Sequence, residues 1–149
     1  MAFAMTDVFT RQERSAVMSR IKGKDNKTTE VAFIILLKAN SIKGWRRQWP
    51  VAGRPDVAFP KEKIAVFVDG CFWHQCPRHR KIPESNRSYW MEKFRAGKAK
   101  RLKDKRLLRA GGWTVLEVWE HDLKDDAGKA NVLGRVHEVL SVGHERRMG

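Results

Sequence analysis

The stretch Ile64-Ala65-Val66-Phe67-Val68 decides the fold. Five consecutive apolar residues, most of them β-branched or aromatic, are typical of a strand that is buried on both faces. A turn over residues 60–63 precedes this strand, and a shorter apolar segment, residues 56–59, precedes the turn. Two strands joined by a tight turn form a hairpin, so the sequence predicts a β-hairpin in the core of the domain.

The segments on either side of this hairpin predict helices and further extended chain. Before the hairpin, the sequence predicts a basic helix over residues 10–21, an apolar helix that Thr28 caps and that carries residues 31–37, and an extended segment over 44–50. After it, the sequence predicts a helix over 88–108 that ends at Gly111-Gly112 and a buried strand over 114–119. A last amphipathic helix is expected to bury Val132, Val136 and Leu140. Residues 1–27 are expected to form a basic segment that contacts DNA, and residues 143–149 a frayed tail. The order of elements indicates a single α/β domain, residues 1–149, with helices flanking a small mixed sheet.

The composition indicates a polyanionic partner. The chain has 149 residues and a mass of 17.3 kDa, with 31 Lys and Arg against 17 Asp and Glu, a formal net charge of +14 and an isoelectric point near 10.3. Such a charge attracts nucleic acid, or an anionic membrane surface, in a salt-dependent way. No apolar run approaches the ~20 residues of a membrane-spanning helix, and the first residues lack a signal-peptide pattern. We therefore expect a cytoplasmic, nucleoid-associated protein that binds nucleic acid.

Two aspartates stand at the ends of the hairpin strands. Asp56 follows Pro55 at the start of the first strand, and Asp69 ends the second, so the hairpin brings both to one end of the sheet. Mg²⁺ prefers few carboxylates, with carbonyl or water oxygens and a phosphate as its other ligands. One Asp beside a strand-end carbonyl meets that need. A turn-capping role is the alternative for Asp56.

Cysteine and histidine gather directly after the second strand. Cys71, Cys76 and His79 follow a C-x4-C-x2-H spacing, and His121 follows the strand predicted over residues 114–119. These four side chains suit a tetrahedral structural Zn²⁺, which would hold a loop too short and polar to keep its shape by burial. Two reduced structural thiols and two surface imidazoles are the alternative.

His74 and Glu30 are the candidates for acid–base chemistry. His74 lies three residues beyond Cys71 and would project from the same loop toward Asp56, where a general base takes a proton from water. Glu30 falls in the first turn of the apolar helix, a position that the helix dipole favours. A favourable surface charge is therefore the alternative interpretation of Glu30.

Aromatic and basic side chains near this loop favour a DNA interface. Phe72, Trp73 and Trp90 lie in basic surroundings, and apolar wedges between base steps kink a duplex. Core packing is the alternative for Trp90. Nine basic residues against one acid, Asp104, lie between residues 93 and 109, and phosphate neutralisation explains them better than a solvated surface. The nine are Lys93, Arg95, Lys98, Lys100, Arg101, Lys103, Lys105, Arg106 and Arg109.

Four blocks of the sequence, in this order, resemble the very-short-patch-repair (Vsr-type) DNA mismatch endonucleases. They are Gly53-Arg54-Pro55-Asp56, Phe67-Val68-Asp69-Gly70-Cys71-Phe72-Trp73-His74 with Cys76-Pro77, Tyr89-Trp90-x-x-Lys93, and Gly112-Trp113-x-Val115-x-x-Val118-Trp119-Glu120. The resemblance implies a PD-(D/E)xK restriction-endonuclease-like core and a Mg²⁺-dependent nick on the 5′ side of the thymine in a T:G mismatch. We expect a 3′-hydroxyl and a 5′-phosphate as products.

The resemblance also implies roles for individual residues. The metal aspartate falls on Asp56, with the backbone carbonyl of Val68 sharing the metal, the general base falls on His74, and an acidic residue near the active centre falls on Glu30. The zinc ligands fall on Cys71, Cys76, His79 and His121. The intercalating aromatics fall on Phe72, Trp73 and Trp90, and the mismatch contacts fall on Met18 and Lys93.

Three positions depart from the family pattern. The family usually has Asn and Asp where this chain has Gly97 and Arg101, and other members carry His where Asp69 stands. We therefore expect Asp69 and Arg101 to form an ion pair in which the negative and positive residues stand at positions opposite to those of the family's Asp and His. Gly97 removes a side chain that is expected to help in reading the mismatch, which puts the T:G specificity in question.

Two alternative functions arise from these departures. One is a nuclease of the same fold that serves defence or another repair route, with a different lesion or sequence as its target. The other is a zinc-stabilised DNA-binding module without catalysis. We expect a monomer, because no exposed apolar stripe indicates a dimer, and the sequence leaves open an association with mismatch-repair proteins or a cytosine methyltransferase.

Overall fold

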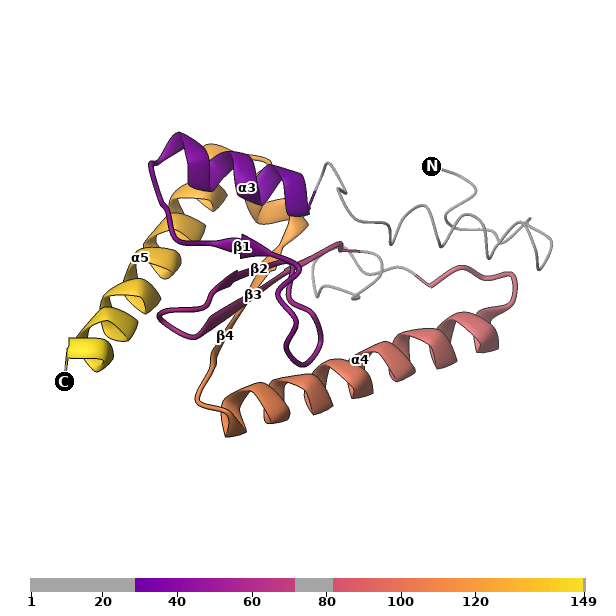
Figure 1. Ribbon diagram of the computed structural model, residues 1–149. Coiled ribbons are helices and arrows are strands. Elements are labelled where there is room, and N and C mark those ends of the chain that lie inside the picture. Colours follow the sequence, from indigo (N-terminus) through magenta and orange to yellow (C-terminus); the bar gives the residue numbers. More distant parts are fainter. Residues whose placement is uncertain (1–28, 72–81, 149) are drawn as a thin grey trace.

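The computed structural model describes residues 29–71 and 82–148, which form a small sheet between helices (Figure 1). The elements in chain order are α3 (Glu30–Ala39), β1 (Arg46–Arg47), β2 (Val57–Phe59), β3 (Ile64–Asp69), α4 (Arg87–Ala110), β4 (Thr114–Trp119), the 3-10 helix η1 (Glu120–Leu123) and α5 (Asp126–Met148). From residue 29 onward, the predicted order of helices and strands is confirmed. The predicted helix over residues 10–21 and the predicted cap Thr28 lie outside the described residues.

The sheet has four strands in the order β1-β2-β3-β4. Strands β1, β2 and β3 pair antiparallel, with Val57 opposite Val66, so the predicted hairpin is confirmed. Strand β4 runs parallel to β3, with Val68 opposite Val118, and α4 makes the connection between them. The sheet is therefore mixed, as the sequence predicts.

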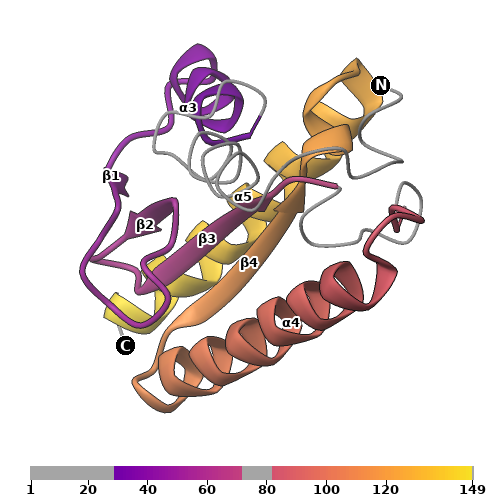
Figure 2. The same cartoon turned by 90° about the vertical axis from the view of Figure 1, so that its right-hand side faces the viewer.

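Alternating residues of β3 pack on the two faces of the sheet. Ile64, Val66 and Val68 join a core with Phe33 of α3 and Val136 of α5. Ala65 and Phe67 pack on the other face with Leu108 of α4. Helices α3 and α5 thus cover one face and α4 covers the other (Figure 2). All six residues of β3 are buried, because a strand between two helical layers has no face in water.

Helix α4 has 24 residues, which is about 36 Å of helix. Its second half packs against the sheet through Leu108, and its first half, beginning at Arg87, projects beyond the sheet (Figure 1). Gly111 follows the helix and donates its N–H to the carbonyls of Leu107 and Leu108, so the predicted stop is confirmed. No helix among the described residues is long and apolar enough to cross a membrane.

Two predictions about the C-terminal half are wrong. The tail predicted to fray from residue 143 is helical, since α5 continues to Met148. Gly143 is buried there against Glu62, where a Cβ atom would approach the Glu62 Cβ to 2.8 Å. Strand β4 is only half buried, with Leu116 and Val118 in the core, because it lies at the edge of the sheet.

Candidate active site at one end of the sheet

Asp56 lies where β2 begins, after the turn that contains Arg54 and Pro55. Its Oδ2 accepts a hydrogen bond from the backbone N–H of Val68 at 2.7 Å, which ties it to β3. Burial raises the pKa of Asp56 to about 6. The hydrogen bond from the Val68 N–H and the positive charge of Arg101 lower this pKa, whereas the negative charges of Glu30 and Asp69 raise it further. Three carboxylates from separate elements therefore act on one another here.

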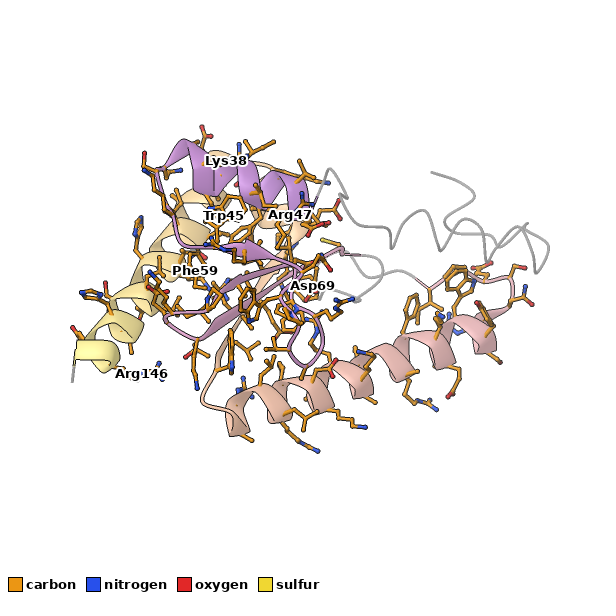
Figure 3. All side chains as sticks on the ribbon, viewed as in Figure 1. Lys38, Trp45, Arg47, Phe59, Asp69 and Arg146 are labelled. Carbon is orange, nitrogen blue, oxygen red and sulfur yellow. The ribbon has the colours of Figure 1, made fainter. Side chains whose placement is uncertain are left out.

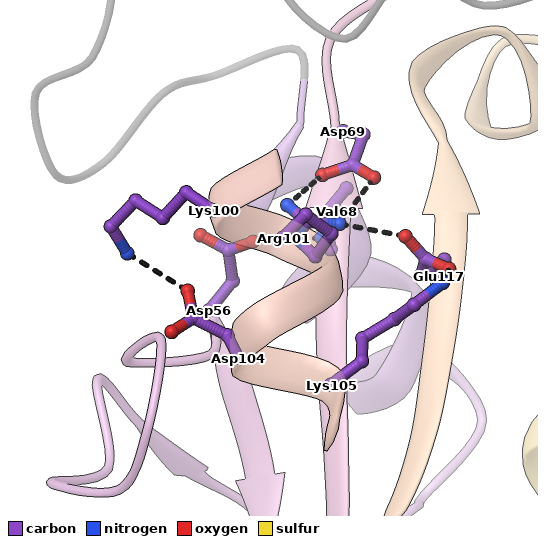
Figure 4. A network of polar contacts seen from close by, with 8 residues as sticks. All are labelled: Asp56, Val68, Asp69, Lys100, Arg101, Asp104, Lys105 and Glu117. Atoms are coloured by element: carbon purple, nitrogen blue, oxygen red, sulfur yellow. Dashed lines mark hydrogen bonds and ion pairs between the residues drawn. The ribbon is translucent and has the colours of Figure 1, made fainter. Parts of the chain in front are cut away.

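Arg101 of α4 reaches the end of β3 and binds Asp69 with both arms of its guanidinium (Figure 4). Nη1 donates to Oδ2 at 2.8 Å, and Nη2 donates to Oδ1 at 2.7 Å. The guanidinium also lies over the Phe67 ring, 4.1 Å from its centroid. The predicted ion pair is therefore present, and Arg101 faces the sheet rather than the outer surface on which a DNA contact depends.

Glu117 of β4 extends this ion pair into a network. Its Oε2 accepts from Arg101 Nη1 and its Oε1 from Lys105 Nζ, both at 2.9 Å. Burial alone would raise the pKa of Glu117, but Lys105 and Arg101 outweigh it and lower the pKa. Burial would likewise lower the pKa of Arg101, and its bonds to Asp69 and Glu117 raise it instead. The network therefore stays ionised and fastens the middle of α4 to β3 and β4.

Glu30, at the start of α3, is buried, with 3% of the residue exposed. Its Oε1 accepts a hydrogen bond from Gln48 Nε2 at 2.7 Å, and its Oε2 lies 3.2 Å from Arg47 Nη2. The backbone N–H of Gln48 also donates to the Asp56 carbonyl at 3.3 Å. The interpretation of Glu30 as a surface charge is therefore wrong, because β1 and the residue after it cover the carboxylate.

Arg47 and Asp69 lie at the same end of the sheet, and Phe59 lies at the other (Figure 3). Arg47 pairs with Glu30 and Arg101 pairs with Asp69. Within residues 29–71 and 82–148, no Lys or Arg pairs with Asp56. A half-buried carboxylate with two arginine-neutralised neighbours, and with no cation of its own among these residues, fits a divalent cation, whose charge favours the ionised form.

Oxygen donors at this end of the sheet suit Mg²⁺. Asp56 offers its second oxygen, Oδ1, and Val68 carries a backbone carbonyl on the adjacent strand. Mg²⁺ takes few protein ligands and fills its other positions with water and phosphate oxygens. Asp56 and Val68 are therefore the residues that could hold it.

Cys71, which follows the end of β3, contacts His121 of η1. The Cys71 Sγ lies 3.3 Å from His121 Nδ1, and the Cys71 N–H donates to Glu120 Oε1 at 3.3 Å. A thiol and an imidazole in contact are donors of the kind that Zn²⁺ prefers. Cys76 and His79 lie outside the described residues, and no group of three or more metal-binding side chains occurs in the part of the chain that the structure describes.

The predicted DNA-contacting residues fall in two groups. Met18, Phe72, Trp73 and the predicted base His74 lie outside the described residues. Trp90 is only 7% exposed and stacks on Phe94 with 5.9 Å between ring centroids, as its packing alternative predicts. Lys93, in the second turn of α4 at its projecting end, is half buried.

Some of the basic residues of α4 form ion pairs and others do not. Lys100 pairs with Asp104, and Arg101 and Lys105 pair with residues of the sheet. Five others have no ion-pair partner among the residues that the structure covers, and all except the first are exposed: Lys93, Lys98, Lys103, Arg106 and Arg109. Unpaired cations along one helix are suited to phosphate contacts.

Sequence reasoning missed Arg47, Gln48, Lys105 and Glu117 as parts of the site. A single glutamine after an exposed strand carries no motif, and Glu117 lies in a stretch that is otherwise apolar. Glu117 was the one detectable signal, because an acidic residue inside an apolar strand needs a partner.

Residues 6–80 match the family described as DNA mismatch endonuclease Vsr. The chain is 44% identical over 86 residues to the type II nicking enzyme V.NaeI of Lentzea aerocolonigenes, a match that covers 58% of this chain and 51% of that protein. It is 36% identical over 125 residues to the type II nicking enzyme V.NmeAIP of Neisseria meningitidis serogroup A, covering 83% and 88%. It is 30% identical over 121 residues to the DNA mismatch endonuclease Vsr of Escherichia coli K12, covering 80% and 77%. The chain therefore belongs to the Vsr family of DNA mismatch endonucleases and is a DNA endonuclease.

Proposed function

We propose that this protein nicks double-stranded DNA on the 5′ side of the thymine in a T:G mismatch and acts in very-short-patch repair. The reaction depends on Mg²⁺ and leaves a 3′-hydroxyl and a 5′-phosphate. The observation that carries the proposal is Asp56, a half-buried carboxyl with its pKa raised to about 6 and held against β3 by the Val68 N–H. The name of the E. coli relative, DNA mismatch endonuclease, supports the choice of substrate.

Asp56 and the Val68 carbonyl hold the metal in this proposal. When bound, Mg²⁺ stabilises negative charge on the scissile phosphate and lowers the pKa of a coordinated water. Asp56 supplies the negative charge, while Arg47 and Arg101 neutralise Glu30 and Asp69 beside it. The mixed sheet between helical layers supports the expectation of a PD-(D/E)xK-like core.

His74 takes the proton from the attacking water in this proposal. An imidazole changes its protonation near neutral pH, which suits a base that acts beside a metal. The proposal rests on its position three residues after Cys71, in the loop that begins at the end of β3. Phe72 and Trp73, which precede it, would then wedge into the duplex close to the reacting phosphate.

Helix α4 supplies phosphate contacts along its exposed side. Its unpaired cations, with the basic residues of the segment 1–27, neutralise the DNA backbone and position the duplex without reading its sequence. Arg101 ties the same helix to the end of β3, so a duplex bound along α4 is held in a fixed relation to Asp56. This coupling favours catalysis over the alternative of a binding module.

A structural Zn²⁺ on Cys71, Cys76, His79 and His121 holds the loop after β3 in this proposal. The contact between Cys71 and His121 supports it, because these two residues lie 50 positions apart in the chain and bring a thiol and an imidazole together. The ion would join the loop that carries His74 to η1.

A second candidate function is strand nicking at another target. The relatives V.NaeI and V.NmeAIP are named type II nicking enzymes, and this chain has Gly97 where its family usually has Asn. A site built with one fewer polar side chain on α4 would recognise the mismatch less strictly, and flanking sequence would then determine where the enzyme cuts.

A nicking assay on strand-labelled duplexes separates these functions. The wild type, Asp56→Ala and His74→Ala are incubated with Mg²⁺ and a duplex that contains either T:G or T:A at one position. Cleavage of the thymine strand of T:G alone, lost in both variants, supports the proposal. Equal cleavage of both duplexes supports the second candidate, and binding without cleavage contradicts both.

A further inference from the structure

Gln48 contacts two segments that carry carboxyl groups at the candidate active site, one with the buried Glu30 and one with the half-buried Asp56. Its side-chain Nε2 donates to Glu30 Oε1 at 2.7 Å, and its backbone N–H donates to the Asp56 carbonyl at 3.3 Å. Glu30 belongs to α3 and Asp56 immediately precedes β2, so these two residues come from elements that do not follow each other directly. One residue therefore links the two.

Gln48 adopts a left-handed backbone conformation, with φ 50°. A residue with a Cβ atom is strained in this region, which glycine occupies freely, and such strain persists only where surrounding contacts enforce it. Ser41, with φ 55°, has the same conformation at the end of α3, where helices often end in this way. Gln48 follows a strand, and its conformation turns the side chain toward Glu30 while the main chain stays on Asp56.

We propose that Gln48 is a positioning residue of the metal-dependent nicking reaction, holding the Glu30 carboxylate in a fixed orientation beside Asp56. This inference rests on the proposed function. Gln48 binds one carboxylate oxygen of Glu30 and Arg47 lies beside the other, so together they fix the plane of the group. A carboxylate held in this way would orient water near a cation bound by Asp56.

A neutral donor suits this position. Arg47 already supplies Glu30 with one positive charge, and a second cation would compete with the metal for the negative potential around Asp56. The amide of Gln48 gives a directional hydrogen bond and adds no charge. Glutamine at this position therefore orients the carboxylate while leaving the net charge of the site unchanged.

The test compares Gln48→Gly with Ser41→Gly. Both substitutions remove strain at a left-handed residue, and Ser41 is exposed beyond the end of α3 opposite to Glu30. We measure the unfolding midpoint, the dissociation constant for Mn²⁺ by electron paramagnetic resonance, and kcat and KM on the T:G duplex. Gln48→Gly should unfold near the wild-type midpoint, because relief of strain offsets the lost hydrogen bond.

The expected loss is in chemistry and not in DNA binding. Gln48→Gly should lower kcat by between about tenfold and about a hundredfold, with KM for the duplex unchanged, because a misoriented reacting group has an effect of this size. It should also weaken Mn²⁺ binding, whereas Ser41→Gly should match the wild type in every readout. If Gln48→Gly does not fold, Gln48→Asn serves in its place, since asparagine tolerates the left-handed region and is too short to reach Glu30.

The outcomes separate this inference from the function on which it rests. A wild type that nicks while Gln48→Gly retains its kcat and Mn²⁺ affinity overturns the inference alone. A wild type that nicks neither the T:G nor the T:A duplex contradicts the proposed function, and the inference with it. A loss of kcat that follows the unfolding midpoint, with Mn²⁺ affinity intact, shows a purely structural role and also overturns the inference.

Discussion

Arg101 and Asp69 form a two-armed ion pair that joins the middle of α4 to the end of β3, with contacts of 2.7 and 2.8 Å. Both side chains are largely buried, at 15% and 4% exposure. The helix on which the basic residues lie is therefore fastened directly to the strand that holds Val68 against Asp56. Through this link, the position of α4 is tied to the end of the sheet where Asp56 lies.

Replacing Arg101 by Met should destabilise the protein by about 3 kcal/mol, because it leaves the buried Asp69 carboxylate without its counter-charge. Adding Asp69→Leu should recover most of this loss, since the double variant no longer buries the Asp69 charge. Urea unfolding of the two single variants and the double variant measures the coupling. Arg95→Met is the control, because Arg95 pairs with Glu92 on the exposed surface of the same helix. Additive effects of the two substitutions would contradict the coupling.

Asp56→Asn should stabilise the metal-free protein at neutral pH and not at acidic pH. The folded state binds the Asp56 proton with a pKa of about 6, against an ordinary value of 3.8, so folding becomes less favourable as pH rises through this interval. The difference corresponds to up to about 3 kcal/mol. Urea unfolding of both proteins at pH 4 and pH 7.5 should show the variant gaining relative stability as pH rises. A pH-independent difference would contradict the raised pKa.

The purified protein should contain one zinc ion per chain, and Cys71→Ser should lose it. In the proposed zinc site the ion stabilises the segment after β3, so the variant and the chelated wild type should unfold at a similar, lower temperature. Elemental analysis and thermal unfolding measure both effects. His137→Ala, which replaces an exposed histidine of α5, is the control and should keep its zinc. Wild-type protein without zinc but with full stability would refute the zinc site.

The exposed lysines of α4 should set the salt dependence of DNA binding. Replacing Lys98 and Lys103 by Gln should weaken duplex binding and reduce the slope of log affinity against log salt by between about one and about two. The matched control replaces Lys43 and Lys61, which are exposed and lie outside α4. Titrations at several salt concentrations measure both slopes. Equal slopes for the two double variants would show that α4 is not the phosphate-binding surface.

The sequence predicts the sheet well because β3 is apolar on both faces and turns bound it. The first predicted strand begins one residue before β2 does, at Asp56 instead of Val57. The Arg101–Asp69 pair was also predictable, because both residues stand at positions where the family carries the opposite arrangement of charges. Local patterns of this kind depend only on neighbouring residues or matched positions.

The remaining features depend on tertiary contacts. A glutamate in the first turn of a helix is favoured by the helix dipole whether it is exposed or buried, so the pattern could not reveal that Arg47 and Gln48 cover Glu30. Glycine is a poor helix former, and for that reason Gly143 predicts a frayed tail. Its close contact with Glu62 explains why a glycine is needed inside α5.

The measurement that tests the role of Asp56 most directly is single-turnover nicking of a labelled T:G duplex by the wild type and Asp56→Asn in Mg²⁺. We expect Asp56→Asn to fold normally and to bind the duplex with wild-type affinity, while its nicking rate falls by at least about a hundredfold. Nicking by Asp56→Asn at the wild-type rate would contradict a metal site on Asp56, because the metal would then have to be held by other residues.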